Sequence, residues 1–114
     1  MTFSRAGEAN RAAEINHEDL VEALRKETCA VVDVREAGEF ASGHIPGAIN
    51  LPLSRFDPEE LPTDKPVVLV CQSGGRSAKA LQRALASGIS NICHYRPGTT
   101  GWRAQGGRTV EGGV

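Results

Sequence analysis

The stretch that decides the fold runs from Val67 to Ser77 and reads Val-Val-Leu-Val-Cys-Gln-Ser-Gly-Gly-Arg-Ser. Its first four residues are apolar without alternation, which is typical of a central strand covered on both faces. A glycine-bearing turn follows, and the leucines and alanines after it predict a helix over 77–87. The stretch therefore predicts a strand, a tight turn and a helix, with Cys71 placed directly after the strand.

The sequence on either side repeats this alternation of apolar strand-like runs and helical patterns. Alternation of this kind is typical of a parallel sheet with crossover helices. We therefore predict an α/β domain with a mostly parallel central sheet of about five short strands and helices on both faces. The expected strands cover residues 30–34, 48–51, 67–70, 91–95 and 109–110. The expected helices cover 36–41, 77–87 and 99–105, with a strand end and a helix over 15–27.

Size and composition describe an ordinary globular domain. The chain has 114 residues, of which 39% are apolar and 24% charged, and its net charge is -1. That charge gives no reason to expect nucleic-acid binding, and no apolar run approaches the roughly 20 residues of a membrane helix. We expect a loose arm over 1–13, one domain over 14–110 and a tail over 111–114. Residues 1–10 lack the apolar segment of a signal peptide, so we expect a cytoplasmic location.

The three cysteines are Cys29, Cys71 and Cys93. An odd number at wide spacing does not suggest a disulfide framework, and no Cys/His spacing suits a metal, so we predict no metal site and no cofactor. Cys29 and Cys93 lie in or beside expected strands and are interpreted as inert buried thiols, although their roles stay open.

The turn after the central strand has the features of an anion-binding loop. Its backbone N–H groups and the start of the next helix can converge on one point, and Arg76 adds a positive charge. A cysteine at that point has a lowered pKa because its thiolate is stabilised. Cys71 is therefore a candidate nucleophile; the alternative is that it is only the last buried residue of its strand.

Several segments resemble those of rhodanese-homology domains, in the same order from about Ile15 to Val110. They are Asp-Val-Arg-Glu at 33–36 with Glu-Phe at 39–40, Gly-His-Ile-Pro-Gly-Ala-Ile-Asn at 43–50, the loop at 71–77, and Pro97-Gly98 with Gly101-Trp102. Pro97 departs from the family's usual glycine. The resemblance implies a rhodanese-like fold and a single-domain sulfurtransferase.

The length of the loop distinguishes among relatives. Four residues separate Cys71 from Arg76, whereas the related cell-cycle phosphatases and arsenate reductases have one residue more, which makes room for a tetrahedral oxyanion. The shorter loop resembles that of the sulfurtransferases and favours sulfur transfer over phosphatase or arsenate reductase chemistry.

The resemblance also implies roles for individual residues. Cys71 would attack the sulfane sulfur of thiosulfate or a thiol persulfide, and the resulting persulfide would pass its outer sulfur to cyanide or a thiol. Arg35 would meet an anionic donor, while Asp33 and His44 give structural support. Arg76 either binds the donor or braces the loop. The persulfide would be bound by the loop residues Gln72, Ser73, Gly74, Gly75, Arg76 and Ser77.

The partners implied are a small sulfur donor, a thiol or cyanide acceptor, and in addition a protein sulfur donor. An alternative is a relay or sensing module that takes persulfide sulfur from a protein partner. We expect a monomer without nucleic acid or membrane in this chain, although similar domains are sometimes joined to membrane segments. The physiological donor, acceptor and pathway stay open.

Overall fold

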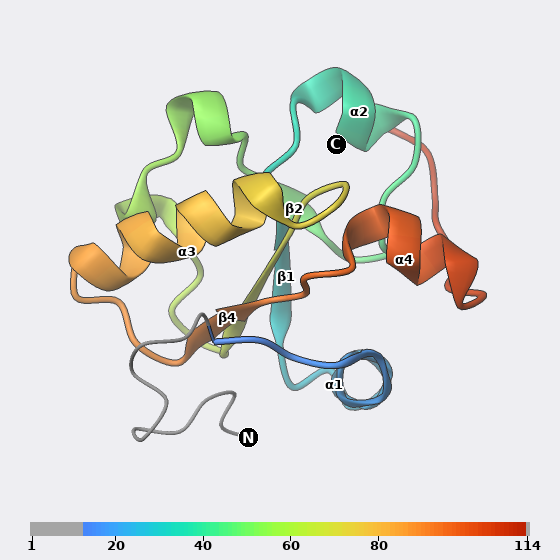
Figure 1. Cartoon of the computed structure of the whole chain (residues 1–114), viewed down its shortest axis with the longest axis horizontal. Helices are drawn as coiled ribbons and strands as arrows, with labels where there is room; N and C mark the ends of the chain where they lie inside the picture. Colours follow the sequence, from blue (N-terminus) through green and yellow to red (C-terminus); the bar gives the residue numbers. More distant parts are fainter. Residues whose placement is uncertain (1–12, 114) are drawn as a thin grey trace.

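The computed structural model describes residues 13–113 and contains a four-stranded parallel sheet of order β2-β1-β3-β4 (Figure 1). The two long strands, β1 and β3, pair along their whole length, from Ala30↔Val67 to Asp33↔Val70. The α/β prediction is therefore confirmed. The strands are β1 (Ala30–Asp33), β2 (Ile49–Asn50), β3 (Val67–Val70) and β4 (Ile92–His94).

Helices cover both faces of the sheet, as predicted, and each face has its own core. Figure 1 shows α1 and α3 on opposite sides. Phe40 of α2 and Trp102 of α4 share one apolar cluster with α1, whereas Leu81 of α3 belongs to the other. The helices are α1 (His17–Lys26), α2 (Ala37–Ala41), α3 (Gly75–Ala86) and α4 (Gly98–Ala104), with 3-10 turns η2 (Leu53–Arg55) and η3 (Pro58–Glu60).

The fifth strand, expected over 109–110, is reduced to an isolated antiparallel bridge between Val110 and His44. Next to the strand end expected at Ile15, Glu14 forms an isolated parallel bridge with His94. This second bridge cannot lengthen because the chain turns into α1 at once: Asn16 caps that helix by accepting from the Asp19 N–H at 2.8 Å. Residues 13–113 therefore contain four strands, close to the number predicted.

The domain limits differ slightly from the predicted ones. Residues 1–12 of the predicted arm and Val114 lie outside the described residues. Ala13 is already part of the fold, because its carbonyl accepts from the His94 N–H at 2.9 Å. In the predicted tail, the Gly112 N–H donates to the Ala41 carbonyl at 2.9 Å.

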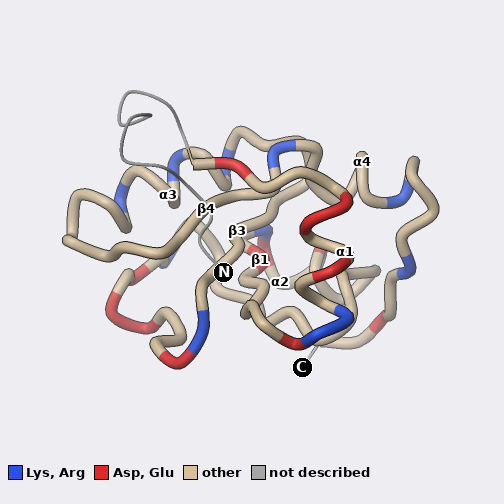
Figure 2. Tube along the Cα trace, turned by 90° about the horizontal axis from the view of Figure 1, so that it is seen from below, with Lys and Arg blue, Asp and Glu red and all other residues tan. Residues whose placement is uncertain are grey.

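Charges of both signs are interspersed along the described chain, as Figure 2 shows. No helix within residues 13–113 combines the length and the apolar character needed to cross a membrane.

Helix α3 begins at Gly75, two residues before its predicted start, and its buried face differs from the expected one. Leu81 and Leu85 are four residues apart, and this spacing predicts that they lie on one face of the helix. Leu81 is 1% exposed, whereas Leu85 is 46% exposed. The inward face is completed by small residues, Ser77, Ala80 and Ala84, which let the helix lie close to the sheet.

This pair of leucines provides a test of the fold. We expect Leu81→Ala to lower the free energy of unfolding by about 2–5 kcal/mol, because it leaves a cavity in the core. Leu85→Ala, in the same helix, should change it by no more than about 0.5 kcal/mol. Urea unfolding measures both, and equal losses would contradict the packing of α3.

Candidate active site

The loop between β3 and α3 folds around the sulfur of Cys71. The Gly74 N–H donates to Sγ at 3.1 Å and the Ser77 N–H at 3.3 Å. The Ser77 hydroxyl oxygen lies 3.5 Å from the same sulfur. These donors come from the turn and the first turn of α3, so the start of the helix faces the sulfur, as the sequence predicted.

The surroundings of Cys71 favour its thiolate. Burial raises the pKa of the thiol, but hydrogen bonds outweigh this effect and lower the pKa below its ordinary value. They come from the Ser77 side chain and from the N–H groups of Ser77, Gly74 and Ser73. Cys71 is only 1% exposed, so its thiolate is stabilised by protein donors rather than by water.

Helix α4 holds the beginning of the loop. The Thr99 N–H donates to the Cys71 carbonyl at 2.8 Å, and the Thr100 N–H donates to the Gln72 carbonyl at 3.1 Å. Gly98 permits this approach: it has a φ of 68°, and a Cβ there would collide with the Gln72 carbonyl. Pro97 has a φ of -61°, proline's own preferred value, so its departure from the family pattern fits the start of α4.

Gly74 is the second glycine that the loop requires. It adopts a φ of 100°, and a Cβ would lie 2.6 Å from the Arg96 carbonyl oxygen. Gly74 is also the N-cap of α3. The Ser77 hydroxyl oxygen lies 3.2 Å from the Gly74 carbonyl oxygen and 2.9 Å from Nδ1 of His94, so its single proton can go to either.

Arg76 forms a bidentate ion pair with Glu39 of α2. Its two terminal nitrogens lie 2.7 and 3.0 Å from the carboxylate oxygens. The bond to Arg76 is the main cause that lowers the pKa of Glu39 to about 2, so the carboxylate stays charged at neutral pH. Of the two roles left open for Arg76, this geometry favours bracing, with its charge compensated.

Asp33 and Arg35 form a buried ion pair at the carboxyl end of β1. The Arg35 Nε donates to Asp33 Oδ1 at 3.0 Å, and its Nη2 donates both to Asp33 Oδ2 at 2.8 Å and to the Gly43 carbonyl at 2.7 Å. Asp33 thus holds the Arg35 side chain in place, and its supporting role in the site stays a prediction. This geometry does not favour a free charge on Arg35 for an anionic donor, because Asp33 compensates that charge.

His44 lies in the turn after α2, where structural support was predicted. Its Nδ1 lies 2.8 Å from the Phe40 carbonyl oxygen, and its ring stacks on the Phe40 ring with centroids 3.7 Å apart. The imidazole is therefore bonded within the turn.

A polar cleft of about 220 Å³ begins at Gln72, next to Cys71. The loop after β3, the start of α4 and residues in and next to α2 line this cleft. Its lining residues are Arg35, Glu39, Ser42, Gln72, Thr99, Thr100 and Arg103. Ser73 and Gln72 are exposed, so this side of the loop is open to a substrate.

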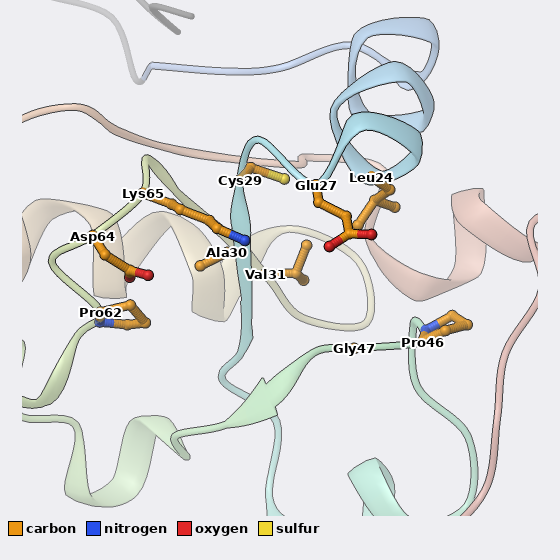
Figure 3. Close-up of a pocket in the computed structure, with 10 residues that line it drawn as sticks. All are labelled: Leu24, Glu27, Cys29, Ala30, Val31, Pro46, Gly47, Pro62, Asp64 and Lys65. Carbon is orange, nitrogen blue, oxygen red and sulfur yellow. The ribbon is translucent and has the colours of Figure 1, made fainter.

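A larger hollow of about 420 Å³ lies at the amino end of β1, away from the loop. Figure 3 shows Cys29, Lys65 and Glu27 around it. Burial raises the pKa of the Cys29 thiol, although Lys65 opposes this. In parallel sheets the reactive end is the carboxyl end, so we assign the chemistry to the Cys71 loop rather than to the larger hollow.

Cys93 lies in β4, within the apolar core. Burial raises the pKa of its thiol well above the ordinary value. Cys71 is thus the one cysteine among the described residues whose pKa is lowered.

Sequence reasoning missed three residues of this site. Thr99 and Thr100 hold the loop through backbone N–H groups, which every residue type except proline supplies, so no sequence signal was available. His94 contacts Ser77 from β4; a histidine inside an otherwise apolar strand was the available signal.

Comparison with known proteins gives a consistent result. A family model described as "Rhodanese-like domain" matches residues 16–105. A sulfurtransferase of Allochromatium vinosum is 34% identical over 96 residues, which cover 82% of this chain and 90% of that protein. A solved rhodanese-related protein of Thermoplasma volcanium has a TM-score of 0.76 at 34% identity, covering 85% of this chain and 96% of its own.

The curated relatives also include longer proteins. An uncharacterized protein of Synechocystis is 43% identical over 91 residues, which cover 77% of this chain. The matched part spans 51% of the length of that protein.

The position of Gly98 can be tested by substitution. We expect Gly98→Ala to lower the free energy of unfolding by about 1–3 kcal/mol, because alanine is strained at this φ and its Cβ meets the loop. Gly75→Ala is the matched control: no atom lies within 4 Å of its Cβ position. It should be neutral or stabilising in urea unfolding. Equal effects would contradict the close approach of α4.

The lowered pKa of Cys71 predicts selective modification. At neutral pH, iodoacetamide should alkylate Cys71 at least about tenfold faster than Cys29 or Cys93, because one pKa unit changes the thiolate fraction about tenfold. The rate should fall as the pH drops through the lowered pKa. Peptide mass spectrometry measures each site, and uniform modification would contradict an activated thiolate.

Proposed function

Because the chain belongs to the rhodanese-like domain family, we propose that it is a sulfurtransferase that carries sulfane sulfur as a persulfide on Cys71. The observation that carries this proposal is the set of backbone donors converging on the Cys71 sulfur, together with the lowered pKa of its thiol. A thiolate held in this way is a nucleophile, and the same donors suit an added sulfur that bears the negative charge.

The first half-reaction loads the enzyme. The Cys71 thiolate attacks the outer sulfur of thiosulfate, the new S–S bond forms, and the old S–S bond breaks with its electron pair leaving on sulfite. With a thiol persulfide as donor, the leaving group is the thiolate instead. In either case no net oxidation is needed, and the enzyme holds Cys71–S–S⁻.

The second half-reaction removes the outer sulfur from the enzyme. Cyanide or a thiolate attacks the outer sulfur, and the electron pair of the breaking bond returns to the Cys71 sulfur. The N–H groups of Gly74 and Ser77 face the Cys71 sulfur, which is negative before loading and again after the outer sulfur has left. Donors that are already oriented need no reorganisation as the charge moves.

The charges near the loop bear on the choice of donor. Glu39 compensates Arg76 and Asp33 compensates Arg35, so these two arginines offer little unpaired positive charge to a dianion such as thiosulfate, and Arg103 is the other arginine that lines the cleft. This supports a thiol persulfide, or a protein that carries one, as an equal or better donor. A protein-fed relay is therefore the second form of the same proposal.

Intact-protein mass spectrometry tests the persulfide. We expect brief incubation with thiosulfate or a small thiol persulfide to add roughly 32 Da, one sulfur atom, and cyanide to remove it. Cys71→Ser should gain nothing, while Cys93→Ser serves as the matched control and should load normally. An adduct that persists in Cys71→Ser would contradict the assignment. Loading only from a protein donor would favour the relay form.

The ion pair between Arg76 and Glu39 can be tested by substitution. Glu39→Gln keeps an oxygen acceptor but frees the charge of Arg76, so we expect kcat/KM for thiosulfate to rise about fivefold, equivalent to about 1 kcal/mol. The control Glu59→Gln removes the same charge from η3, away from the loop. A rise of the same size in both variants, or no rise, would show that the pairing of Arg76 does not limit thiosulfate.

A further inference from the structure

A buried histidine continues the line of polar groups behind the Cys71 sulfur. His94, the last residue of β4, is 2% exposed. Its Nδ1 lies 2.9 Å from Ser77 Oγ, which in turn lies 3.5 Å from Cys71 Sγ. The sulfur, the hydroxyl and the imidazole thus form a continuous chain of groups that can exchange protons.

The hydroxyl can pass a proton in one direction at a time. While Cys71 is a neutral thiol, its S–H group donates to Ser77 Oγ. The single hydroxyl proton then goes either to the Gly74 carbonyl oxygen at 3.2 Å or to His94 Nδ1 at 2.9 Å. The shorter distance favours the histidine as acceptor.

Glu14 determines which nitrogen of His94 is free to accept. Its Oε2 lies 3.9 Å from Nε2 on the far side of the ring. That distance exceeds a hydrogen bond, but a nearby carboxylate favours a proton on Nε2, which leaves the Nδ1 lone pair facing Ser77.

The surroundings of His94 keep the ring neutral until a proton arrives. Burial lowers the pKa of His94, Glu14 raises it and Arg96 lowers it further. Glu14 comes from the segment before α1 and Arg96 from the segment after β4. Ser77 comes from α3, and Cys71 directly follows β3. A neutral buried imidazole with an accepting nitrogen is suited to take up a proton.

We propose that His94 is a positioning residue that takes up, through Ser77, the proton that Cys71 loses when it becomes a thiolate. The S–H bond breaks and its electron pair stays on sulfur, while the proton moves to Ser77 Oγ. The original hydroxyl proton moves to Nδ1 and forms an N–H bond there. The product is a thiolate hydrogen-bonded to Ser77 and an imidazolium held between Ser77 and Glu14.

This arrangement sets a positive charge behind the sulfur only when the sulfur is negative. It deepens the proposed function, on which it rests only in taking Cys71 as the reacting thiol. Alkylation by iodoacetamide needs no sulfur donor, so its result is separate from that of sulfur loading.

The test is the pH profile of Cys71 alkylation between about pH 5 and pH 9. The asparagine of His94→Asn can bond to Ser77 but cannot take up a proton. We therefore expect the midpoint of the alkylation profile to rise by about one pH unit in this variant. The rate at the acid end then falls about tenfold, while the plateau at high pH is unchanged. Glu14→Gln should shift the profile in the same direction by a smaller amount. His17→Asn, which removes another histidine, on α1, should leave it unchanged.

A second measurement works in a protein that retains His94. Since coupling between two titrating groups is reciprocal, NMR titration should show a higher pKa for His94 in the wild type than in Cys71→Ser. Superimposable alkylation profiles for wild type and His94→Asn would overturn the proposal. Equal His94 pKa values in wild type and Cys71→Ser would overturn it as well, even if His94→Asn failed to fold.

Discussion

The chemistry at Cys71 depends on which way the peptide groups of its loop face. The carbonyls of Cys71 and Gln72 are held by N–H groups at the start of α4, and the N–H groups of Gly74 and Ser77 point at the sulfur. Gly98 and Gly74 make this possible, since each sits where a side chain would strike another backbone segment. The parallel pairing of β1 with β3, and of β3 with β4, brings these segments to one end of the sheet.

The fold and the reactive loop could be predicted because their signals are local. An apolar run, a glycine turn and a helical pattern follow one another within residues 67–87, and each pattern predicts the conformation of its own segment. The missing fifth strand, expected over 109–110, was less accessible, since its pairing is a single bridge from Val110 to His44, which lies far away in the sequence. The exposure of Leu85 depends on how closely the small residues of α3 let that helix approach the sheet.

The contacts that complete the site depend on residues far apart in the sequence. Arg76 and Glu39 are 37 positions apart, and Ser77 and His94 are 17 apart. No local pattern predicts such pairs; the topology of the sheet creates them. Both arginines that sequence reasoning offered for an anionic donor, Arg35 and Arg76, have a carboxylate partner. The positive potential directly at the sulfur comes instead from the peptide dipoles of Gly74 and Ser77, whose N–H groups donate to it.

The positive potential of peptide dipoles acts over a shorter range than that of a cluster of cations. The field of a peptide dipole falls off within a few ångströms, and mobile ions do not screen it inside a buried loop. Paired charges such as Arg76 and Glu39 likewise project little field into the solvent. These groups therefore add little long-range attraction for a charged donor. Salt would weaken the attraction of an exposed cation such as Arg103 at the cleft, but it would leave the hydrogen bonds of the buried loop to the Cys71 sulfur unchanged.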